Sequence, residues 1–304
     1  MTEPGLINKV PSVRGDLIPN AILSKSSWFR VGGPAELLFM PKDELDLKTF
    51  KKKLDPDIPF TVLGATSNVL IRDGGIKGVV VKLGSNFNHM NNYNDLIIVG
   101  GAVMDMKISL LAAKKRIGGM EFLSGIPGTI GGSVKMNAGA YGNDVSDILY
   151  KVKLMKNNGS ILELCPAKLK MKYRNTSISK QSVVIEVELK GYQCDQKLIF
   201  EKIKEINNQR SKTQPIKNLT GGSTFRNPPG CKAWELIDKV GCRGMSIGGA
   251  RISEIHPNFI ISDGNATAND IENLGLEAKK RVLDNFGIKL EWEILRLGYK
   301  IERN

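Results

Sequence analysis

The sequence is poor in the residues that most often hold metal ions. Its 304 residues include four cysteines and two histidines, and no two cysteines form a C-x-x-C pair. Zinc sites draw several Cys and His ligands from short, regular spacings. We therefore expect no metal site, and we expect the cysteines to be reduced.

Targeting segments and aromatic residues are also scarce. The first residues lack the charged, apolar and small-residue sections of a signal peptide, and no apolar run is long enough to cross a bilayer. Aromatic residues make up 6% of the chain and are dispersed, whereas single-stranded nucleic acids are bound by aromatic side chains interleaved with basic ones. We expect a cytoplasmic monomer that binds neither a membrane nor nucleic acid.

Positive charge and glycine are abundant instead. The formal net charge is +13, and 32 residues are glycine. Such a charge suits either a basic, well-solvated surface or a partner rich in phosphate, such as a nucleotide. The densest basic runs, 51–53 and 279–281, fall in helix-like segments, where a solvated helix face explains them. The length is that of about two domains.

The pattern of apolar and turn residues predicts an α+β fold. It lacks the regular βαβ rhythm and the G-x-G-x-x-G opening of a Rossmann domain. Helices are expected at 43–54, 104–117, 198–210, 232–240 and 267–285. Strands are expected at 35–40, 60–63, 79–83, 96–99, 152–155, 160–164, 183–189, 259–262 and 290–297. Residues 1–20, rich in Pro and Gly, are expected to form a loosely ordered arm, and 244–249 a flexible loop.

A glycine-rich run spans residues 124–142. Gly125, Gly128, Gly131 and Gly132 remove Cβ atoms, so that backbone N–H groups can approach an anion, and short hydroxyl side chains lie among them. This chemistry suits a pyrophosphate. A glycine-rich packing corner has the same composition, so spacing alone leaves both interpretations open. The run is not a P-loop, because no Gly-Lys-Ser or Gly-Lys-Thr follows.

A second run of small residues and hydroxyls spans 63–75. On its own it is typical of an ordinary turn between a strand and a helix. Two such runs in one chain favour a large cofactor that carries phosphate.

Seven ordered motifs carry a resemblance to a known family. They are Ser27–Ala35 with the two runs above, Tyr173–Ser177, Gly221–Pro228, His256–Phe259 and Leu290–Ile294. In this order they resemble UDP-N-acetylenolpyruvoylglucosamine reductase, over nearly the whole chain past the arm. The absence of an insertion after Gly142 is similar to the shorter of the family's two structural types.

The resemblance implies a fold and a domain order. It implies an FAD-binding region of the vanillyl-alcohol-oxidase/PCMH type, followed by a smaller α+β substrate domain. We expect an arm at 1–20, the FAD-binding region at 21–210 in two subdomains (about 21–83 and 84–210), and the substrate domain at 211–289. The last strand, within 290–304, is expected to return to the FAD-binding region.

The family reaction is the NADPH-dependent reduction of UDP-N-acetylglucosamine enolpyruvate to UDP-N-acetylmuramate, a step of peptidoglycan precursor synthesis. FAD carries the hydride between NADPH and substrate. Neither histidine lies in a motif that tethers flavin, so FAD is expected to bind non-covalently. The matched motifs imply these cofactor-binding residues: Arg30, Gly64, Thr66, Ser67, Asn68, Gly125, Pro127, Gly128, Thr129, Gly132, Ser133, Asn137 and Ala138.

Three residues match the family's catalytic positions. Arg174 would stabilise negative charge beside the substrate carboxylate, Ser223 would donate a proton, and Glu293 would act as an acid. Without the resemblance, a surface arginine and a turn serine are the better interpretations, and periodicity in the predicted strand 290–297 does not choose between Glu291 and Glu293. Lys212, Arg226 and Asn227 match substrate-binding positions.

The sequence departs from the family pattern at three places. Thr66 stands where Gly is usual, which adds a Cβ near the expected pyrophosphate. Arg226 replaces Lys, which keeps the charge but changes the donor geometry, and Pro257 replaces a small residue. The alternative function is another FAD-dependent oxidoreductase or oxidase of the same superfamily, which would lack the motifs around Ser223 and Glu293.

Overall fold

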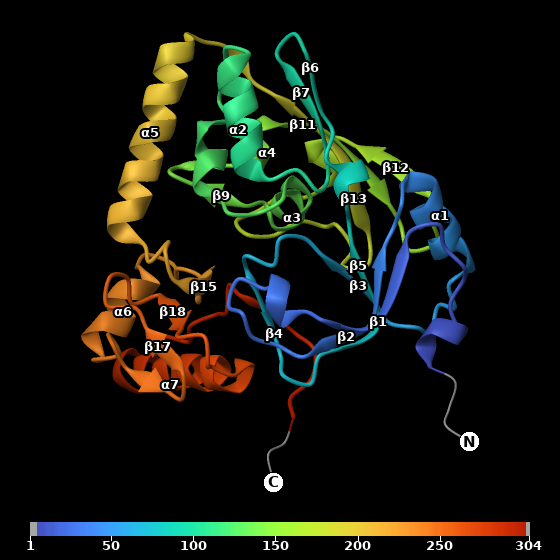
Figure 1. Ribbon diagram of the computed structural model, residues 1–304. Coiled ribbons are helices and arrows are strands. Elements are labelled where there is room, and N and C mark those ends of the chain that lie inside the picture. The colour runs from blue at the N-terminus through green and yellow to red at the C-terminus, as the bar shows by residue number, and fades with distance from the viewer. Residues whose placement is uncertain (1–4, 302–304) are drawn as a thin grey trace. The chain divides into compact units, whose positions relative to one another are not determined.

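The computed structural model describes residues 5–301 (Figure 1). These residues form two compact units, each built from separate stretches of chain. Within the described range, unit 1 comprises residues 5–20, 36–65 and 77–209, and unit 2 comprises 21–35, 66–76 and 210–301. The predicted functional domains follow chain order, whereas both units are discontinuous, and the functional boundaries stay a prediction.

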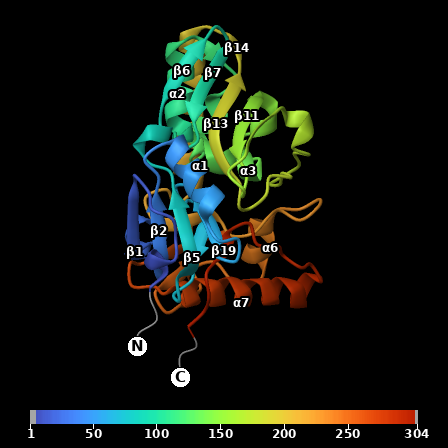
Figure 2. The same ribbon diagram turned by 90° about the vertical axis from the view of Figure 1, so that its right-hand side faces the viewer.

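A four-stranded sheet lies mainly in unit 1. Its order is β1 (Asp16–Ile22), β2 (Pro34–Met40), β5 (Ile76–Lys82) and β3 (Phe60–Leu63), and β3 and β5 are parallel. Helix α1 (Glu44–Lys53) begins where the Asp43 side chain accepts the Asp46 N–H at 2.9 Å, as predicted for a helix cap. Helix α1 lies beside this sheet (Figure 2). Its Leu47 and Phe50 are buried in one apolar cluster with residues of the sheet, including Phe39.

A five-stranded antiparallel sheet forms the rest of the unit 1 core. Its order is β12 (Ile161–Leu164), β11 (Leu149–Met155), β13 (Val183–Lys190), β7 (Leu96–Gly100) and β6 (Met90–Tyr93). Helices α2 (Asp105–Lys114) and α3 (Ile130–Met136) pack against it around a shared apolar core (Figure 1). Shorter elements complete the unit: β8 (Ile117–Gly118) with β14 (Tyr192–Gln193), β9 (Gly139–Ala140) with β10 (Asn143–Asp144), and α4 (Val145–Ile148). Helix α5 (Gln196–Thr213) follows, and its buried Ile199 and Ile203 pack against Ala113 of α2.

Unit 2 is built on a second antiparallel sheet. Its order is β15 (Leu219–Ser223), β18 (Phe259–Ser262), β17 (Ala250–Ile252) and β16 (Ser246–Ile247). Helices α6 (Ala233–Lys239) and α7 (Ala268–Phe286) cover it (Figure 2). A capping box of Thr267 and Asp270 starts α7, close to the predicted helix 267–285, and Gly287, at φ 67°, ends it. The short strand β4 (Val69–Ile71) pairs in parallel with β19 (Leu295–Leu297).

Three predicted elements need smaller corrections in extent or kind. The described part of the arm is ordered: residues 16–22 form β1, and the Arg14 and Gly15 N–H groups donate to the Asp46 carboxylate at 2.8 and 2.9 Å. The predicted helix 104–117 ends at Lys114, because Ile117 and Gly118 pair with β14 instead. The loop 244–249 contains β16.

The predicted strand 290–297 is the largest correction. Only 295–297 form a strand, β19, while Trp292 makes a single bridge to Phe225. The segment changes pairing partners along its length, so no continuous ladder forms over it. The strand periodicity that left both Glu291 and Glu293 open therefore has no strand at these two positions. None of the helices within 5–301 is both long and apolar enough to cross a bilayer.

Candidate active site

The glycine-rich run of unit 1 combines packing glycines with one open surface. A Cβ on Gly131 would lie 2.7 Å from the Gly101 carbonyl oxygen, and one on Gly125 would lie 2.6 Å from the Tyr141 ring. Such distances are shorter than real Cβ contacts, so these two glycines are required for packing. A Cβ on Gly132, by contrast, would meet nothing closer than Thr129 Oγ1 at 3.7 Å.

A cavity of about 310 Å³ lies beside Gly132. Three of the predicted cofactor-binding residues line it: Gly64, Thr129 and Gly132. A Cβ on Gly64 would lie 2.6 Å from Thr129 Oγ1, so a side chain there would close the gap between the two glycine-bearing loops. The volume is at the lower end for ligand pockets, which fits a part of FAD such as its phosphates rather than the whole molecule.

Residues that the sequence analysis missed complete this lining. Lys82, at the end of β5, and Lys135, on α3, bring two cations to the cavity, and Gly101 and Met104 add backbone and apolar surface. Burial lowers the pKa of Lys135 to about 8. A hydroxyl, two ammonium groups and glycine backbone form a donor set that suits pyrophosphate. Lys135 lies within the glycine-rich run itself, but nothing in the local sequence indicated Lys82, because its segment meets the run only in the folded chain.

Several predicted cofactor residues use their side chains within the protein. The Ser133 hydroxyl donates to Asp105 Oδ2 at 2.6 Å, and the Asn137 amide is held by three protein groups. Ala138 is buried in unit 1. Gly125, Pro127 and Gly128 belong to the same run but do not line the 310 Å³ cavity.

The fully buried carboxyl of Asp105 lies behind this run. Its Oδ2 would be 3.1 Å from a Cβ on Gly128, and its backbone N–H donates to the Gly128 carbonyl at 3.0 Å. Its Oδ1 has no hydrogen-bond partner among residues 5–301. Burial raises the pKa of Asp105 to about 7, although the bond from Ser133 lowers it. The group that supports the run is therefore partly neutral near pH 7.

The other predicted cofactor residues belong to unit 2. Thr66, in the position where the family has Gly, takes the left-handed conformation at φ 58° and donates its hydroxyl to the Ser26 carbonyl at 3.1 Å. Arg30 is exposed and donates to the Lys25 carbonyl. The Asn68 side chain donates to the Glu293 carbonyl at 3.1 Å, so this residue holds the segment that carries the predicted acid.

Unit 2 brings Ser223 and Glu293 together. Ser223 ends β15, and the Glu293 N–H donates to the carbonyl of the next residue, Thr224, at 2.9 Å. The two glycines before Ser223 are needed for different reasons, one for its lack of a side chain and the other for its backbone conformation. A Cβ on Gly221 would lie 2.3 Å from the Phe29 ring, and Gly222 has φ 79°. Ser223 and Glu293 are both partly buried, so a hydroxyl group and a carboxylate lie on adjacent segments.

Arg174 lies in unit 1 at the tip of a tight turn. Lys172 and Asn175 exchange both backbone hydrogen bonds, at 2.9 and 3.0 Å, with Tyr173 and Arg174 between them. Arg174 has φ 54°, and its guanidinium donates to the Gly139 carbonyl at 2.8 Å. The predicted surface-loop setting is right, but the arginine is partly buried and held by the end of the glycine-rich run.

The predicted substrate residues all belong to unit 2. Lys212 is exposed on the last turn of α5. The Arg226 guanidinium lies 4.0 Å from the Glu291 carboxylate. The Asn227 side chain accepts the Ala233 N–H at 3.0 Å and so holds the start of α6.

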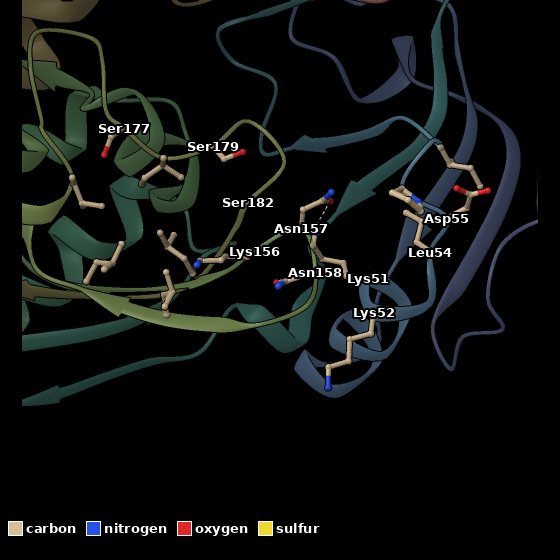
Figure 3. A pocket seen from close by; sticks show the side chains of 17 residues that line it. Lys51, Lys52, Leu54, Asp55, Lys156, Asn157, Asn158, Ser177, Ser179 and Ser182 are labelled. Atoms are coloured by element: carbon tan, nitrogen blue, oxygen red, sulfur yellow. Dashed lines mark hydrogen bonds between the residues drawn. The ribbon is translucent and has the colours of Figure 1, made fainter.

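A larger cavity, of about 610 Å³, lies elsewhere in unit 1 (Figure 3). None of the predicted site residues lines it. Its buried cation, Lys51, donates to the Gln181 carbonyl at 3.0 Å and the Asn157 side chain at 3.4 Å, and lies 3.6 Å from the Phe60 ring centroid. Burial lowers the pKa of Lys51 to about 8. The size of a cavity therefore does not identify the reactive site here. Among residues 5–301 no three His, Cys, Asp or Glu side chains group as metal ligands.

Comparison with known proteins defines the class first. A family model described as "FAD binding domain" matches residues 35–164. This match covers the four-stranded sheet from β2 onward and the glycine-rich run with its cavity. The chain is an FAD-binding protein of α+β fold, as predicted.

A second family model, "UDP-N-acetylenolpyruvoylglucosamine reductase, C-terminal domain", matches residues 214–297. The chain is 46% identical to UDP-N-acetylenolpyruvoylglucosamine reductase from Rickettsia rickettsii over 95% of this chain and 98% of that protein. It is 43% identical to the enzyme of the same name from Methylorubrum populi over 98% of each. The crystal structure of the reductase from Thermus caldophilus has a TM-score of 0.81 at 32% identity, covering 94% of this chain and all of that one. The chain belongs to the UDP-N-acetylenolpyruvoylglucosamine reductase family.

Proposed function

We propose that this chain catalyses the NADPH-dependent reduction of UDP-N-acetylglucosamine enolpyruvate to UDP-N-acetylmuramate through bound FAD. The observation that carries the proposal is that both parts of the family are present, an FAD-binding domain at 35–164 and the reductase-specific domain at 214–297. The second match favours this reaction over that of another FAD-dependent oxidase. The product is a peptidoglycan precursor, and we propose a cytoplasmic monomer.

FAD, when bound, supplies hydride transfer between NADPH and the enolpyruvyl group. We infer that its phosphates lie in the cavity of Gly64, Thr129 and Gly132, where Lys82 and Lys135 offset their charge. Ser133 and Asn137 contribute through the backbone, because their side chains are bonded to other protein groups. Binding is non-covalent. Further contacts are proposed for Arg30, Thr66, Ser67, Asn68, Gly125, Pro127, Gly128 and Ala138.

Negative charge develops beside the substrate carboxylate when hydride adds to the enol ether. The Arg174 guanidinium is the proposed counter-charge, since it is a fixed cation on a rigid turn. Ser223 is the proposed donor of the proton that completes the reduction. A free hydroxyl is a weak acid and needs a neighbour that assists it, and the adjacent Glu293 segment provides a carboxyl group for this purpose. Lys212, Arg226 and Asn227 are proposed to hold the UDP-sugar.

The replacement of Ser223 by Ala tests this assignment. The variant is expected to bind FAD and to oxidise NADPH at the wild-type rate in a stopped-flow experiment, because neither step needs the serine proton. The subsequent reoxidation of flavin by the enolpyruvyl substrate is expected to fall at least about 100-fold, the lower range for loss of a general acid. Equal loss of both half-reactions would contradict the proton-donor role. Purified protein that contains no flavin after incubation with FAD would contradict the proposed function itself.

A further inference from the structure

Asn137 closes the glycine-rich run with an unusual concentration of hydrogen bonds. It ends α3 in the left-handed conformation, at φ 46°, and its side chain is 2% exposed. Its Nδ2 group donates to Asp144 Oδ2 at 3.0 Å and to the Lys172 carbonyl at 3.2 Å. Its Oδ1 accepts the Ser146 N–H at 2.9 Å. Both amide hydrogens and the amide oxygen are thus bonded to the protein.

The bond to Lys172 is one of three that join the end of this run to the Arg174 turn. Arg174 itself donates to the Gly139 carbonyl at 2.8 Å, and the Thr176 hydroxyl donates to the Lys135 carbonyl at 2.8 Å. Residues 135–139 therefore contact residues 172–176 at three successive places. Both segments belong to unit 1, so their mutual geometry is defined.

The same short stretch of chain also borders the cofactor cavity. Lys135 lines that cavity, and its ammonium group donates to the carbonyls of Lys180 and Ser182, at 2.7 and 3.1 Å. The segment that follows the Arg174 turn is therefore held by the residue that faces the cofactor. A shift at the end of α3 would move the turn with it.

We propose that Asn137 is a positioning residue, which holds the Arg174 turn in register with the cofactor segment. The proposal rests on the proposed role of Arg174. Asn137 acts through the Lys172 carbonyl, which belongs to the residue pair that closes the turn. It contacts neither cofactor nor substrate through its side chain.

The geometry also shows which substitution tests this role without unfolding the protein. Glycine accepts the left-handed backbone of Asn137 at no steric cost. The other bonded groups keep alternative partners, because the Ser146 N–H also donates to Asp144 Oδ1 at 2.9 Å and the Lys172 carbonyl also accepts the Asn175 N–H at 3.0 Å. Asn137→Gly therefore removes the three hydrogen bonds of the Asn137 side-chain amide, which together form the amide clamp, while the local fold is retained.

Asn94→Gly is a matched control. Asn94 has φ 52°, nearly the same backbone conformation, but it is exposed in the turn between β6 and β7. Three quantities are measured for both variants: the Kd for FAD of the flavin-free chain, the rate of NADPH oxidation by the FAD-loaded enzyme, and the rate of flavin reoxidation by UDP-N-acetylglucosamine enolpyruvate.

For Asn137→Gly we expect reoxidation to fall at least about 10-fold, with the Kd and the NADPH rate within about 2-fold of wild type. Asn94→Gly is expected to change none of the three. Unchanged reoxidation in Asn137→Gly, or a rise in the Kd together with a fall of both rates, overturns the positioning role. A rise in the Kd alone makes Asn137 a cofactor ligand instead.

The Arg174→Ala variant distinguishes a failure of this proposal from a failure of the proposed role of Arg174. If Arg174→Ala reoxidises normally, the role of Arg174 is wrong, and with it the basis of the proposal. If Arg174→Ala loses reoxidation, adding Asn137→Gly is expected to cause no further loss, because the clamp then has no arginine to position. A further loss of 10-fold or more in the double variant would show that Asn137 acts on some other group.

Discussion

The two units bury a carboxyl group in opposite ways. Asp105, in unit 1, is fully buried with one neutral hydrogen bond, from Ser133, and its pKa rises to about 7. The Glu272 side chain, in unit 2, is 3% exposed and accepts two bonds from Arg72, both at 2.9 Å, and one from Arg296 at 2.8 Å. Burial raises the pKa of Glu272, but the bonds and charge of Arg72 outweigh it, and the pKa lies below its ordinary value.

The difference follows from what each group supports. Asp105 lies behind the run proposed to receive the phosphates of FAD, where a permanent negative charge would oppose the ligand. Glu272 joins three separate parts of unit 2, since Arg72 follows β4, Arg296 lies in β19 and Glu272 lies in α7. The proposed cofactor segment is thus supported by a carboxyl group that is partly neutral near pH 7, and a chain junction is supported by an ion cluster.

The largest effect is expected when the ion cluster loses its anion. Glu272→Gln leaves two arginines and the nearby Lys300 without their shared counter-charge. Breaking a buried pair in this way costs about 3–5 kcal/mol, measured as the free energy of unfolding in urea at pH 7. Glu277→Gln is the control on the same helix, because its pair with Arg281 is partly exposed and is worth about 1 kcal/mol or less.

Lowering the pH should remove the difference in free energy of unfolding between wild type and Glu272→Gln. The folded-state pKa of Glu272 is below its ordinary value, so its contribution is present above about pH 4.5 and is lost as the pH falls through the folded-state pKa. The gap between wild type and Glu272→Gln should therefore narrow in acid. A gap that stays constant down to pH 3 would mean that the ion cluster does not stabilise unit 2.

A smaller effect on stability is expected at Asp105, and its dependence on pH is opposite to that of Glu272. Its folded-state pKa of about 7 exceeds the ordinary 3.8, so the folded protein binds this proton more tightly than the unfolded chain. Stability therefore falls as the pH rises from about 4 to about 7 and is flat above that. Asp105→Asn cannot ionise, and between pH 5 and pH 8 it should gain about 2–3 kcal/mol relative to wild type.

Thermal or urea unfolding at the two pH values measures this gain. Ser133→Ala serves as the second variant, because it removes the bond that lowers the pKa of Asp105 and should extend the falling region to higher pH. Parallel pH profiles for wild type and Asp105→Asn would show that the carboxyl is already ionised when buried, and the contrast between the units would fail.

The smallest effect concerns a neutral buried contact in unit 2. Thr66 combines a left-handed backbone with a β-branched side chain, a conformation that costs about 1–2 kcal/mol. Its hydroxyl bond to Ser26 returns about 0.5–1.5 kcal/mol. Thr66→Gly should leave the free energy of unfolding within about 1 kcal/mol of wild type.

Thr66→Ala loses the same bond but keeps a Cβ in the left-handed region. It is expected to be about 1 kcal/mol less stable than Thr66→Gly in the same urea titration. Equal stability of the two variants would mean that the backbone at this position is not strained.

Local sequence patterns predicted the parts of the fold whose partners lie within one turn. The starts of the helices at 43 and 267 were predicted, because the capping side chains of Asp43 and Thr267 each accept a bond from the N–H three residues further along. The hairpin of β11 and β12 follows from the Asn-Asn-Gly turn between them. The family motifs, read in order, likewise predicted the FAD-binding fold and the reductase family.

Pairing between segments far apart in the chain determined the remaining parts of the fold. The segment 290–297 has strand periodicity, but its partners lie far away in the chain: Asn68, which bonds to Glu293, is 225 residues from it. Only the folded protein shows that 295–297 pair with β4 and that Trp292 forms a bridge to Phe225. Residues 16–20 of the predicted arm belong to β1 for the same reason. Burial also depends on such distant contacts, so no local pattern marked Asp105 as a buried acid or Lys82 as a cavity lysine.

The amino-acid sequence by itself determined the helix caps, the turns, the glycine-rich run and the motifs that identify the family. The tertiary structure decided which of those groups remain available for a ligand. Asn137 and Ser133 are predicted to contact the cofactor, and because their side chains are bonded to the protein, only their backbone groups remain for that contact. A motif specifies the chemistry of a side chain, but hydrogen-bond partners come from segments far along the chain, and they alone determine how that chemistry is used.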